Sequence, residues 1–469
     1  MIVPIGILEA EDIVRSKSRA VVQSQLTIRL TGFMRKVACE WMVLCFVAVS
    51  LAAFAQSGDG TAARVERVLY SFKGGTDGGQ PFGRMISDKA GNLYGTTVDE
   101  YGGNGTVFKL RRKADGGWIK TVLYRFQGGA DGSTPTAGLV FDALGNLYGT
   151  TGQGGKNGQG TVFELTPNHQ GEWTETVLHD FGFSQNNQSD GFLPVAGLVF
   201  DQSGNLYGMT PFGGGSGCGA GCGIVFKLAK STSGWQETVI HTFDGIDGFL
   251  PQGALIIDNG GNLYGTASAT ATDDRDGVVF RLHPTRTGWS YSVLHLFYSA
   301  PPKCTDGSFA GESPTLVMRN GNLYGPAVAG GPSSCIYGTI WELSPSARGK
   351  WKLTTLYDFT GKTNGADAYP TGGLVFDRQG NLDGVTVDLQ NGGNGLGTVF
   401  KLTPSPARPW TKTVLHYFKG VQVGDGSTPV AAPILDVLGN VYGATVEGGY
   451  GKGVCGAFFG CGVIYRITP

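Results

Sequence analysis

Residues 145–151, Gly-Asn-Leu-Tyr-Gly-Thr-Thr, begin with a five-residue phrase that recurs along the chain. The phrase, or a one-residue variant of it, occurs seven times, beginning at Gly91, Gly145, Gly204, Gly261, Gly321, Gly380 and Gly439. Consecutive copies start 54 to 60 residues apart. A repeat of nearly fixed period indicates one structural unit per copy, with each unit packed against its neighbours.

Each copy of the phrase lies among four short apolar runs. In the second copy these runs cover residues 137–142, 146–151, 160–165 and 173–181. They are rich in β-branched and aromatic residues and are bounded by Gly, Asp, Asn or Pro, which is typical of strands. Four strands in each of seven copies predict an all-β fold, a seven-bladed β-propeller of four-stranded blades that covers residues 64–469.

Residue size and the ends of the chain predict the order of the strands in a blade. The first run of six copies begins with small residues, such as Ala137 and Gly138, with Arg84 as the exception among them, and such residues suit a crowded inner strand at the central channel. Residues 65–72 are similar to the outermost strand of a copy, whereas residues 462–468 are similar to the third strand. We therefore expect the N-terminal strand to close the last blade, which removes a free sheet edge.

Composition limits the class of protein. Gly contributes 79 of 469 residues, but the 41% of hydrophobic residues and the lack of a Gly-X-Y period exclude collagen and wholesale disorder. Charged residues are 16% of the chain and the net charge is −1, so we expect no nucleic-acid partner. The glycines gather at turns such as Asp142-Ala-Leu-Gly-Asn146, where Asp can bond the backbone and Gly supplies a positive φ.

The N-terminal region has the pattern of an export signal. Met34-Arg35-Lys36 precedes an apolar run over residues 37–54, and Ala53-Phe54-Ala55 has the small-x-small form that signal peptidase cleaves. A membrane anchor is the alternative, which Glu40 and the shortness of the run disfavour.

This pattern divides the chain before the propeller into three parts. We expect residues 1–33 to be a mis-assigned N-terminal extension, residues 34–55 to be a signal peptide and residues 56–63 to be a short linker. The mature protein should then be a monomer of the extracellular space or cell envelope, with no membrane span after signal cleavage.

Six cysteines follow the signal and fall into three local pairs: Cys218 with Cys222, Cys304 with Cys335, and Cys455 with Cys461. An even number of cysteines in an exported chain predicts disulfides. Zinc ligation is the alternative, disfavoured because the pairs lie far apart in sequence and lack His at ligand spacing. Cys304 and Cys335 lie in two loops that an up-and-down blade places on one face, so their Cα atoms should lie within about 7 Å.

These motifs together resemble a known repeat family. The Gly-Asn-Leu-Tyr-Gly-Thr-Thr unit, a Gly-Gly loop, Gly-Thr-Val-Phe-Lys/Glu-Leu and Asp-Gly-x-x-Pro are similar to the GloVer repeat of secreted bacterial choice-of-anchor tandem repeat proteins. The resemblance covers about residues 64–469. It implies an extracellular repeat protein, in a family without an established activity. Because this chain stops at Pro469, directly after the last strand, we expect release or non-covalent attachment.

Aspartates in the loops between blades are candidates for a binding site. Each begins Asp-Gly-x-x-Pro, or a longer or looser form of it: Asp77, Asp131, Asp190, Asp247, Asp306, Asp367 and Asp425. If they point into the channel mouth, their carboxylates would form an anionic ring for Ca²⁺ or a cationic ligand. If they bond their own backbone, they only shape the turn.

Two further candidates are not repeated. Arg84 is the charged member of the small inner column and would contact a ligand in the channel or be solvated at its mouth. Asp273, Asp274 and Asp276 lie in a fourth-blade loop and form a second candidate cation site.

Three aromatic columns are interpreted as structural. One position of the outer strand holds His or Tyr in every copy: Tyr70, Tyr124, His179, His241, His295, Tyr357 and His416. With one histidine at most per blade, these side chains are too far apart to share an ion. The Trp of the outer strand and the Tyr of the repeated phrase favour packing between blades over sugar stacking. Asp383 replaces this Tyr in the sixth copy.

Two classes of function are compatible with this pattern. The first is a non-catalytic binding or scaffold protein for an extracellular glycan or protein. The second is a propeller enzyme, lactonase-like or lyase-like, with a cation at the channel mouth. An enzyme needs one asymmetric cluster of acid, base or metal ligands, whereas nearly every polar residue here is a repeated one. We therefore favour binding, with no required cofactor and with Ca²⁺ as the ion that the aspartates could hold.

Overall fold

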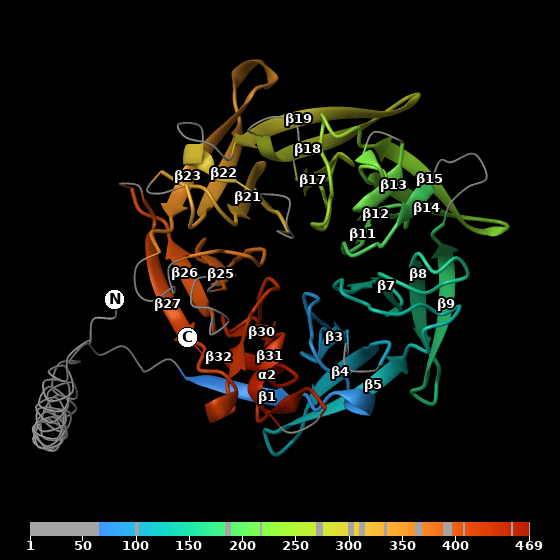
Figure 1. Cartoon of the computed structure of the whole chain (residues 1–469), viewed down its shortest axis with the longest axis vertical. Helices are drawn as coiled ribbons and strands as arrows, with labels where there is room; N and C mark the ends of the chain where they lie inside the picture. The colour runs from blue at the N-terminus through green and yellow to red at the C-terminus, as the bar shows by residue number, and fades with distance from the viewer. Residues whose placement is uncertain are drawn as a thin grey trace, which may run out of the picture. The chain divides into compact units, whose positions relative to one another are not determined.

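The seven sequence repeats form seven four-stranded antiparallel sheets arranged in a ring (Figure 1). The computed structural model describes residues 65–98, 103–182, 189–215, 218–268, 275–298, 304–308, 315–332, 335–361, 368–387, 396–406, 409–451 and 454–468. The predicted extension and signal peptide, and the linker that follows them, lie outside these residues. The predicted fold, a seven-bladed β-propeller, is confirmed. Within the described ranges, no helix is long and apolar enough to cross a membrane.

The blades follow one another along the chain, and the strands of each blade run in order from the axis to the rim. Blade 1 has β2 (Ile86–Ser87), β3 (Leu93–Thr97), β4 (Thr106–Arg112) and β5 (Trp118–Arg125). Blade 2 has β6 (Val140–Phe141), β7 (Leu147–Thr151), β8 (Thr161–Pro167) and β9 (Trp173–Asp180). Blade 3 has β11 (Val199–Phe200), β12 (Leu206–Thr210), β14 (Ile224–Ser231) and β15 (Gly234–Thr242). Blade 4 has β16 (Ile256–Ile257), β17 (Leu263–Ala267), β18 (Arg275–Thr285) and β19 (Gly288–Tyr298).

The remaining blades repeat the same order. Blade 5 has β20 (Val317–Arg319), β21 (Asn322–Ala327), β22 (Thr339–Pro345) and β23 (Trp351–Asp358). Blade 6 has β24 (Val375–Phe376), β25 (Leu382–Thr386), β26 (Thr398–Thr403) and β27 (Thr411–Tyr417). Blade 7 has β29 (Ile434–Leu435), β30 (Val441–Thr445), β32 (Val463–Ile467) and β1 (Glu66–Ser71).

The two ends of the propeller meet in blade 7. β1 pairs antiparallel with β32, so that Glu66 lies opposite Ile467 and Ser71 lies opposite Val463. β32 pairs on its other side with β30. The prediction that the N-terminal strand closes the last blade is therefore confirmed.

The inner strands are shorter than the sequence predicts. The run at residues 137–142 predicts a strand of six residues, but only Val140 and Phe141 pair with β7. The small residues before them contact the neighbouring blade instead, because Thr96 Oγ1 of blade 1 donates a hydrogen bond to the Ala137 carbonyl at 3.0 Å. A Cβ on Gly83 would lie 2.5 Å from the same carbonyl oxygen. The small column therefore allows adjacent blades to meet near the axis.

The turn between the first and second strands has the chemistry that the sequence predicts. In blade 2, Asp142 Oδ1 accepts hydrogen bonds from the backbone N–H groups of Leu144 and Asn146, both at 2.9 Å. Asp142 Oδ2 accepts a hydrogen bond from the Asn146 side chain at 2.8 Å. Gly145 has a φ of +92°, a conformation that residues with a Cβ rarely adopt.

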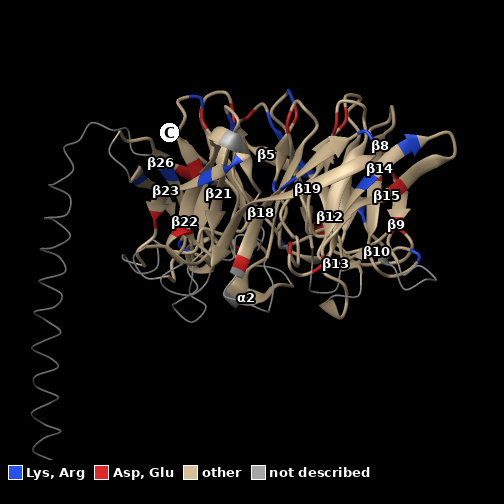
Figure 2. Cartoon of the chain, turned by 90° about the horizontal axis from the view of Figure 1, so that it is seen from above, with Lys and Arg blue, Asp and Glu red and all other residues tan. Residues whose placement is uncertain are grey.

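Two kinds of loop lie together on one face of the ring. The inter-blade loop, which leads from one outer strand to the next inner strand, pairs with the loop between the second and third strands. β10 (Ser189–Phe192) pairs in this way with β13 (Phe212–Gly214), and β28 (Gly426–Ser427) with β31 (Glu447–Gly448). In Figure 2, β10, β13 and the short helix α2 (Gly456–Phe459) lie toward the lower edge of the propeller. The shared loop face predicted from the sequence is confirmed.

The Trp and Tyr columns pack between blades. Trp118 of blade 1 contacts Tyr442 of blade 7, with ring centroids 6.3 Å apart. Trp289 of blade 4 contacts Tyr207 of blade 3 at 5.7 Å. Both pairs are edge-to-face, the arrangement that aromatic quadrupoles favour. Each Trp in these pairs covers the Tyr of the preceding blade, as the structural interpretation expects.

Blade 6 departs from the Tyr column at Asp383, which is fully buried. In five other blades the Tyr hydroxyl contacts the hairpin aspartate, as when Tyr94 donates a hydrogen bond to Asp88 at 3.0 Å. In blade 6 the Nζ of Lys401 lies 2.6 Å from the hairpin Asp377 and 3.3 Å from Asp383. The lysine ammonium group therefore compensates the buried carboxylate.

We expect Lys401→Met to lower the free energy of unfolding by about 3 kcal/mol, because it leaves Asp383 buried without its counter-charge. In an Asp383→Tyr background, which restores the residue of the other blades, the same substitution should cost less than about 1 kcal/mol. Urea unfolding of the four proteins would measure both values. Equal losses in the two backgrounds would show that the pair is not coupled.

Candidate functional site

The inner runs of all seven blades enclose a cavity of about 1170 Å³ on the propeller axis. Its wall is largely apolar and includes Met85, Leu139, Leu198, Leu255, Leu316 and Ile434. Ligand sites in proteins commonly have volumes of about 300–1,000 Å³. The cavity is therefore large enough to hold part of a glycan or a peptide.

Arg84 is the charged residue among the described residues that line this cavity. It comes from the inner run of blade 1, next to Gly83. Its Nε is buried and has no hydrogen-bond partner in the described structure, and burial lowers the pKa of the guanidinium group. Arg84 is half-buried and one nitrogen of its charged group lacks a partner among the described residues, so this position favours a ligand with an anionic group.

The inter-blade aspartates bond to the outer strand and to the loop backbone. Asp190 is representative, because its Oδ2 lies 3.0 Å from His179 Nε2 and its Oδ1 accepts a hydrogen bond from the Gly182 N–H at 2.8 Å. Five other described aspartates contact the His or Tyr of the preceding outer strand, in the pairs Tyr70–Asp77, Tyr124–Asp131, His241–Asp247, His295–Asp306 and His416–Asp425. The His or Tyr column and the Asp column are therefore parts of one contact.

The structure does not bring these aspartates together with Arg84. Their carboxylates contact outer strands, and none belongs to the described lining of the axial cavity. Asp367 lies outside the described residues. The contacts with backbone N–H groups correspond to the turn-shaping interpretation rather than to a ring of carboxylates at the channel mouth.

The pairing of the His or Tyr column with the Asp column is not among the features predicted from the sequence. Its signal is present in the sequence, because each His or Tyr is followed by the aspartate after 6 to 11 residues in every copy. The number of residues between the two varies from copy to copy, so the pairs have no constant spacing in the sequence. In space they meet because the inter-blade loop begins where the outer strand ends.

A third side chain from the next blade approaches five of the pairs. It stands two positions after the Trp of the outer strand, or at the equivalent position of β1: Lys120, Glu175, Glu237, Tyr291 and Glu66. Lys120 Nζ lies 3.1 Å from Asp77 Oδ1, and Tyr291 stacks on His241 with ring centroids 4.1 Å apart. We call each set of three residues an inter-blade junction.

Three junctions place a glutamate beside an aspartate, and in two of them the pKa of the glutamate rises to about 7. Burial raises the pKa of Glu175 to about 7, and the carboxylates of Asp131 and Asp180 add to the rise. Burial also raises the pKa of Glu237 to about 7, while His179 opposes the rise and Asp190 adds to it. The Oε1 atom of each glutamate is buried without a hydrogen-bond partner in the described part of the chain.

The second candidate cation site is only partly described. Asp276 lies in β18, whereas Asp273 and Asp274 lie outside the described residues. The interpretation of these three residues as a cation site therefore stays a prediction.

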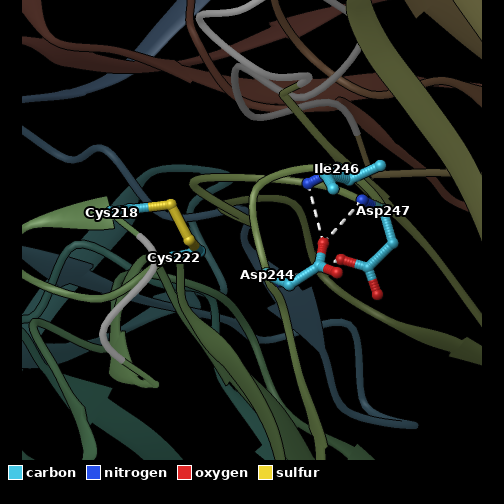
Figure 3. Close-up of a disulfide and its surroundings, with 5 residues drawn as sticks. All are labelled: Cys218, Cys222, Asp244, Ile246 and Asp247. Atoms are coloured by element: carbon cyan, nitrogen blue, oxygen red, sulfur yellow. Dashed lines mark hydrogen bonds between the residues drawn. A yellow bond between two sulfur atoms is a disulfide. The ribbon is translucent and has the colours of Figure 1, made fainter.

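Disulfides join all three predicted cysteine pairs. The Cα atoms are 5.2 Å apart for Cys218–Cys222, 5.5 Å for Cys304–Cys335 and 5.3 Å for Cys455–Cys461. Figure 3 shows Cys218–Cys222 beside the inter-blade turn at Asp244, whose carboxylate accepts hydrogen bonds from the N–H groups of Ile246 and Asp247. The disulfides therefore hold loops on the face where inter-blade loops and second-to-third loops pair.

We expect Glu175→Gln to stabilise the protein at alkaline pH and to have no effect in acid. The unfolded glutamate loses its proton near its ordinary pKa of 4.5, whereas the folded one keeps it up to a pKa of about 7. The folded protein therefore loses stability relative to the unfolded chain as the pH rises between these values. Since the side chain is partly exposed, the gain of the variant at pH 8 should be about 1 kcal/mol.

Guanidinium unfolding at pH 4 and pH 8 would measure this gain, with the exposed Glu172→Gln as the control. A gain of equal size at both pH values, or one shared by the control, would contradict a raised pKa at Glu175.

Solved structures match the chain at low identity. The extracellular domain of BT4673 from B. thetaiotaomicron is 13% identical with a TM-score of 0.48, and the match covers 86% of this chain and 42% of that one. This chain thus spans less than half the length of that structure. An α-L-arabinofuranosidase from Clostridium thermocellum is 15% identical with a TM-score of 0.33, and the match covers 60% of this chain and 94% of that one. A comparison with curated proteins finds no match.

The sequence pattern of one family matches most of the propeller. The pattern of the Gloeobacter/Verrucomicrobia repeat matches residues 54–274 and residues 217–459, which overlap and together include all seven copies of the repeated phrase. The resemblance that the motifs indicate is therefore confirmed, and the chain belongs to the Gloeobacter/Verrucomicrobia repeat family.

Proposed function

We propose that the chain is an exported, non-catalytic binding module that holds an acidic group of an extracellular glycan or protein in its axial cavity. The observation that carries the proposal is Arg84, whose guanidinium group is a positive charge in a largely apolar wall. The three disulfides support an oxidising location outside the cytosol.

The chemistry of the cavity favours a ligand with both apolar and acidic parts. A carboxylate can accept two parallel hydrogen bonds from a guanidinium group, and such charge-assisted bonds are about twice as strong as neutral ones. The aliphatic side chains around Arg84 would contact the apolar faces of sugar rings or the side chains of a peptide. Uronate-containing glycans and peptides with a free C-terminus share this chemistry.

The same charge disfavours the alternative of a propeller enzyme with a cation at the channel mouth. A divalent cation near Arg84 would face a like charge in surroundings of low polarity, where repulsion is stronger than in water. The described His and Asp pairs, which suit acid–base chemistry, stand at separate junctions around the ring. They do not gather with a nucleophile, as an active site requires.

We expect the purified protein to bind acidic members of a printed array, and Arg84→Gln to weaken that binding by at least about tenfold. The array would carry neutral and uronate-containing glycans, together with peptides that end in a free or an amidated C-terminus. Arg111→Gln, at an exposed position of β4, is the matched control and should bind as the unaltered protein does. Circular dichroism would verify that each variant is folded.

Equal binding by Arg84→Gln and the unaltered protein would overturn the proposal, as would binding to neutral probes alone. Turnover of a lactone or of a uronate polymer that stops on addition of EDTA would favour the enzyme instead.

A further inference from the structure

One inter-blade junction holds a histidine and two carboxylates close together. Glu66 comes from β1, His416 from β27, and Asp425 from the inter-blade loop that leads into blade 7. One potential ligand atom from each of the three side chains lies within 4.8 Å of the other two. We call this set the closing junction, because it lies where β1 completes the ring.

The ligand atoms of the closing junction are held by their surroundings. His416 Nε2 lies 3.0 Å from Asp425 Oδ2, and these side chains are only 13% and 8% exposed. The His416 ring stands edge-on to Phe418 with centroids 4.9 Å apart, which fixes the plane of the imidazole. Asp425 Oδ2 also accepts a hydrogen bond from the Lys419 backbone N–H at 2.8 Å.

Among the described residues, Glu66 carries a carboxylate oxygen without a partner, as do the glutamates of two other junctions, so the convergence of the three ligand atoms is what distinguishes the closing junction. Its Oε1 is buried and has no hydrogen-bond partner in the described part of the structure. A buried carboxylate oxygen without a donor is unfavourable, and buried polar atoms of this kind are rare in native proteins. The nearby positive side chain is that of Lys419, which is exposed to solvent.

The other junctions show that this arrangement is particular to one place. Only the junction of His179, Asp190 and Glu237 has the same three residue types. Within the described residues, the closing junction is the one group of three His, Cys, Asp or Glu side chains whose ligand atoms converge. The second junction therefore provides a matched control with the same chemistry and a wider geometry.

We propose that Glu66, His416 and Asp425 bind a divalent transition-metal ion, for which Zn²⁺ is the best fit. Zinc commonly takes three protein ligands from His, Asp and Glu and a water molecule in its fourth position. Ligands about 2.1 Å from one ion lie roughly 3.4 Å apart in a tetrahedron. The 3.0 Å contact between His416 and Asp425 would therefore widen slightly, and Glu66, whose ligand atom lies within 4.8 Å of both, would move closer. Calcium fits less well because it prefers six to eight oxygen ligands.

An ion at this place would join the first strand of the propeller to its sixth and seventh blades. Glu66 lies in the strand that pairs with β32, whereas His416 and Asp425 precede blade 7 in the chain. The ion would therefore act as a structural lock on ring closure. This role is independent of ligand binding at Arg84.

The test uses the purified protein after treatment with EDTA and removal of the chelator. Addition of ZnCl₂ should give one bound zinc per chain by elemental analysis of the desalted protein, and should raise the melting temperature. At a free zinc concentration 100 times the dissociation constant, the ratio of folded to unfolded protein should rise by about 100-fold. MgCl₂ at the same concentration should have no such effect.

Glu66→Gln keeps the shape of the side chain and should weaken zinc binding by at least about tenfold, as should His416→Gln. Glu237→Gln, in the matched junction, and Arg84→Gln should bind zinc as the unaltered protein does. Measurement of bound zinc in the folded variants separates loss of the site from loss of the fold.

Three results would overturn the proposal. One is a protein that retains less than about a tenth of an equivalent of zinc after desalting. Another is equal zinc binding by Glu66→Gln, which would indicate exposed histidines as the binding groups. The third is loss of zinc binding in Glu237→Gln but not in Glu66→Gln.

Discussion

Closure of the ring by antiparallel pairing of β1 with β32 is the constraint on which the rest of the structure depends. Each blade is a small sheet whose faces are covered only by its two neighbours, so a ring left open would expose two apolar faces and a sheet edge. The pairing places an N-terminal strand in the blade that otherwise consists of the last three strands. Closure of the ring places blade 7 beside blade 1, and the inner runs of all seven blades then surround the axial cavity.

The inter-blade junctions share one arrangement but differ in the residue types that form them. In each described case, a His or Tyr at the end of one blade meets the aspartate that begins the next. The third position varies more freely among the junctions, from Lys120 through Glu175 to Tyr291. The constant part of the contact orders the loop, while the varied part gives each junction its own charge. Two junctions combine a glutamate with a histidine and an aspartate, and the zinc proposal concerns the one whose ligand atoms converge within the described residues.

The axial cavity and the inter-blade junctions differ in chemistry. We therefore assign ligand binding to the cavity and a structural role to the junctions. The repeated His, Tyr and Asp residues contact one another between the blades, whereas the cavity is lined mainly by small, aliphatic and aromatic residues. Arg84, in blade 1, is the charged residue of the described lining. Arg84 stands where other copies have a small residue, and it is therefore the best indication of function. The residues that recur in every copy are explained by packing between blades.

The sequence by itself determined the fold class, the strand order, the closing strand and the cysteine pairs. These features depend on local patterns, namely strand periodicity, turn residues and a regular repeat, which can be counted without coordinates. It did not predict the two-residue length of inner strands such as β6, because that length depends on how far the neighbouring blades approach. Nor did it explain Asp383, whose counter-charge Lys401 lies on the next strand. The contacts of the loop aspartates and the convergence of Glu66 with His416 and Asp425 were decided only by tertiary structure, because ring closure brings together residues that the sequence keeps far apart.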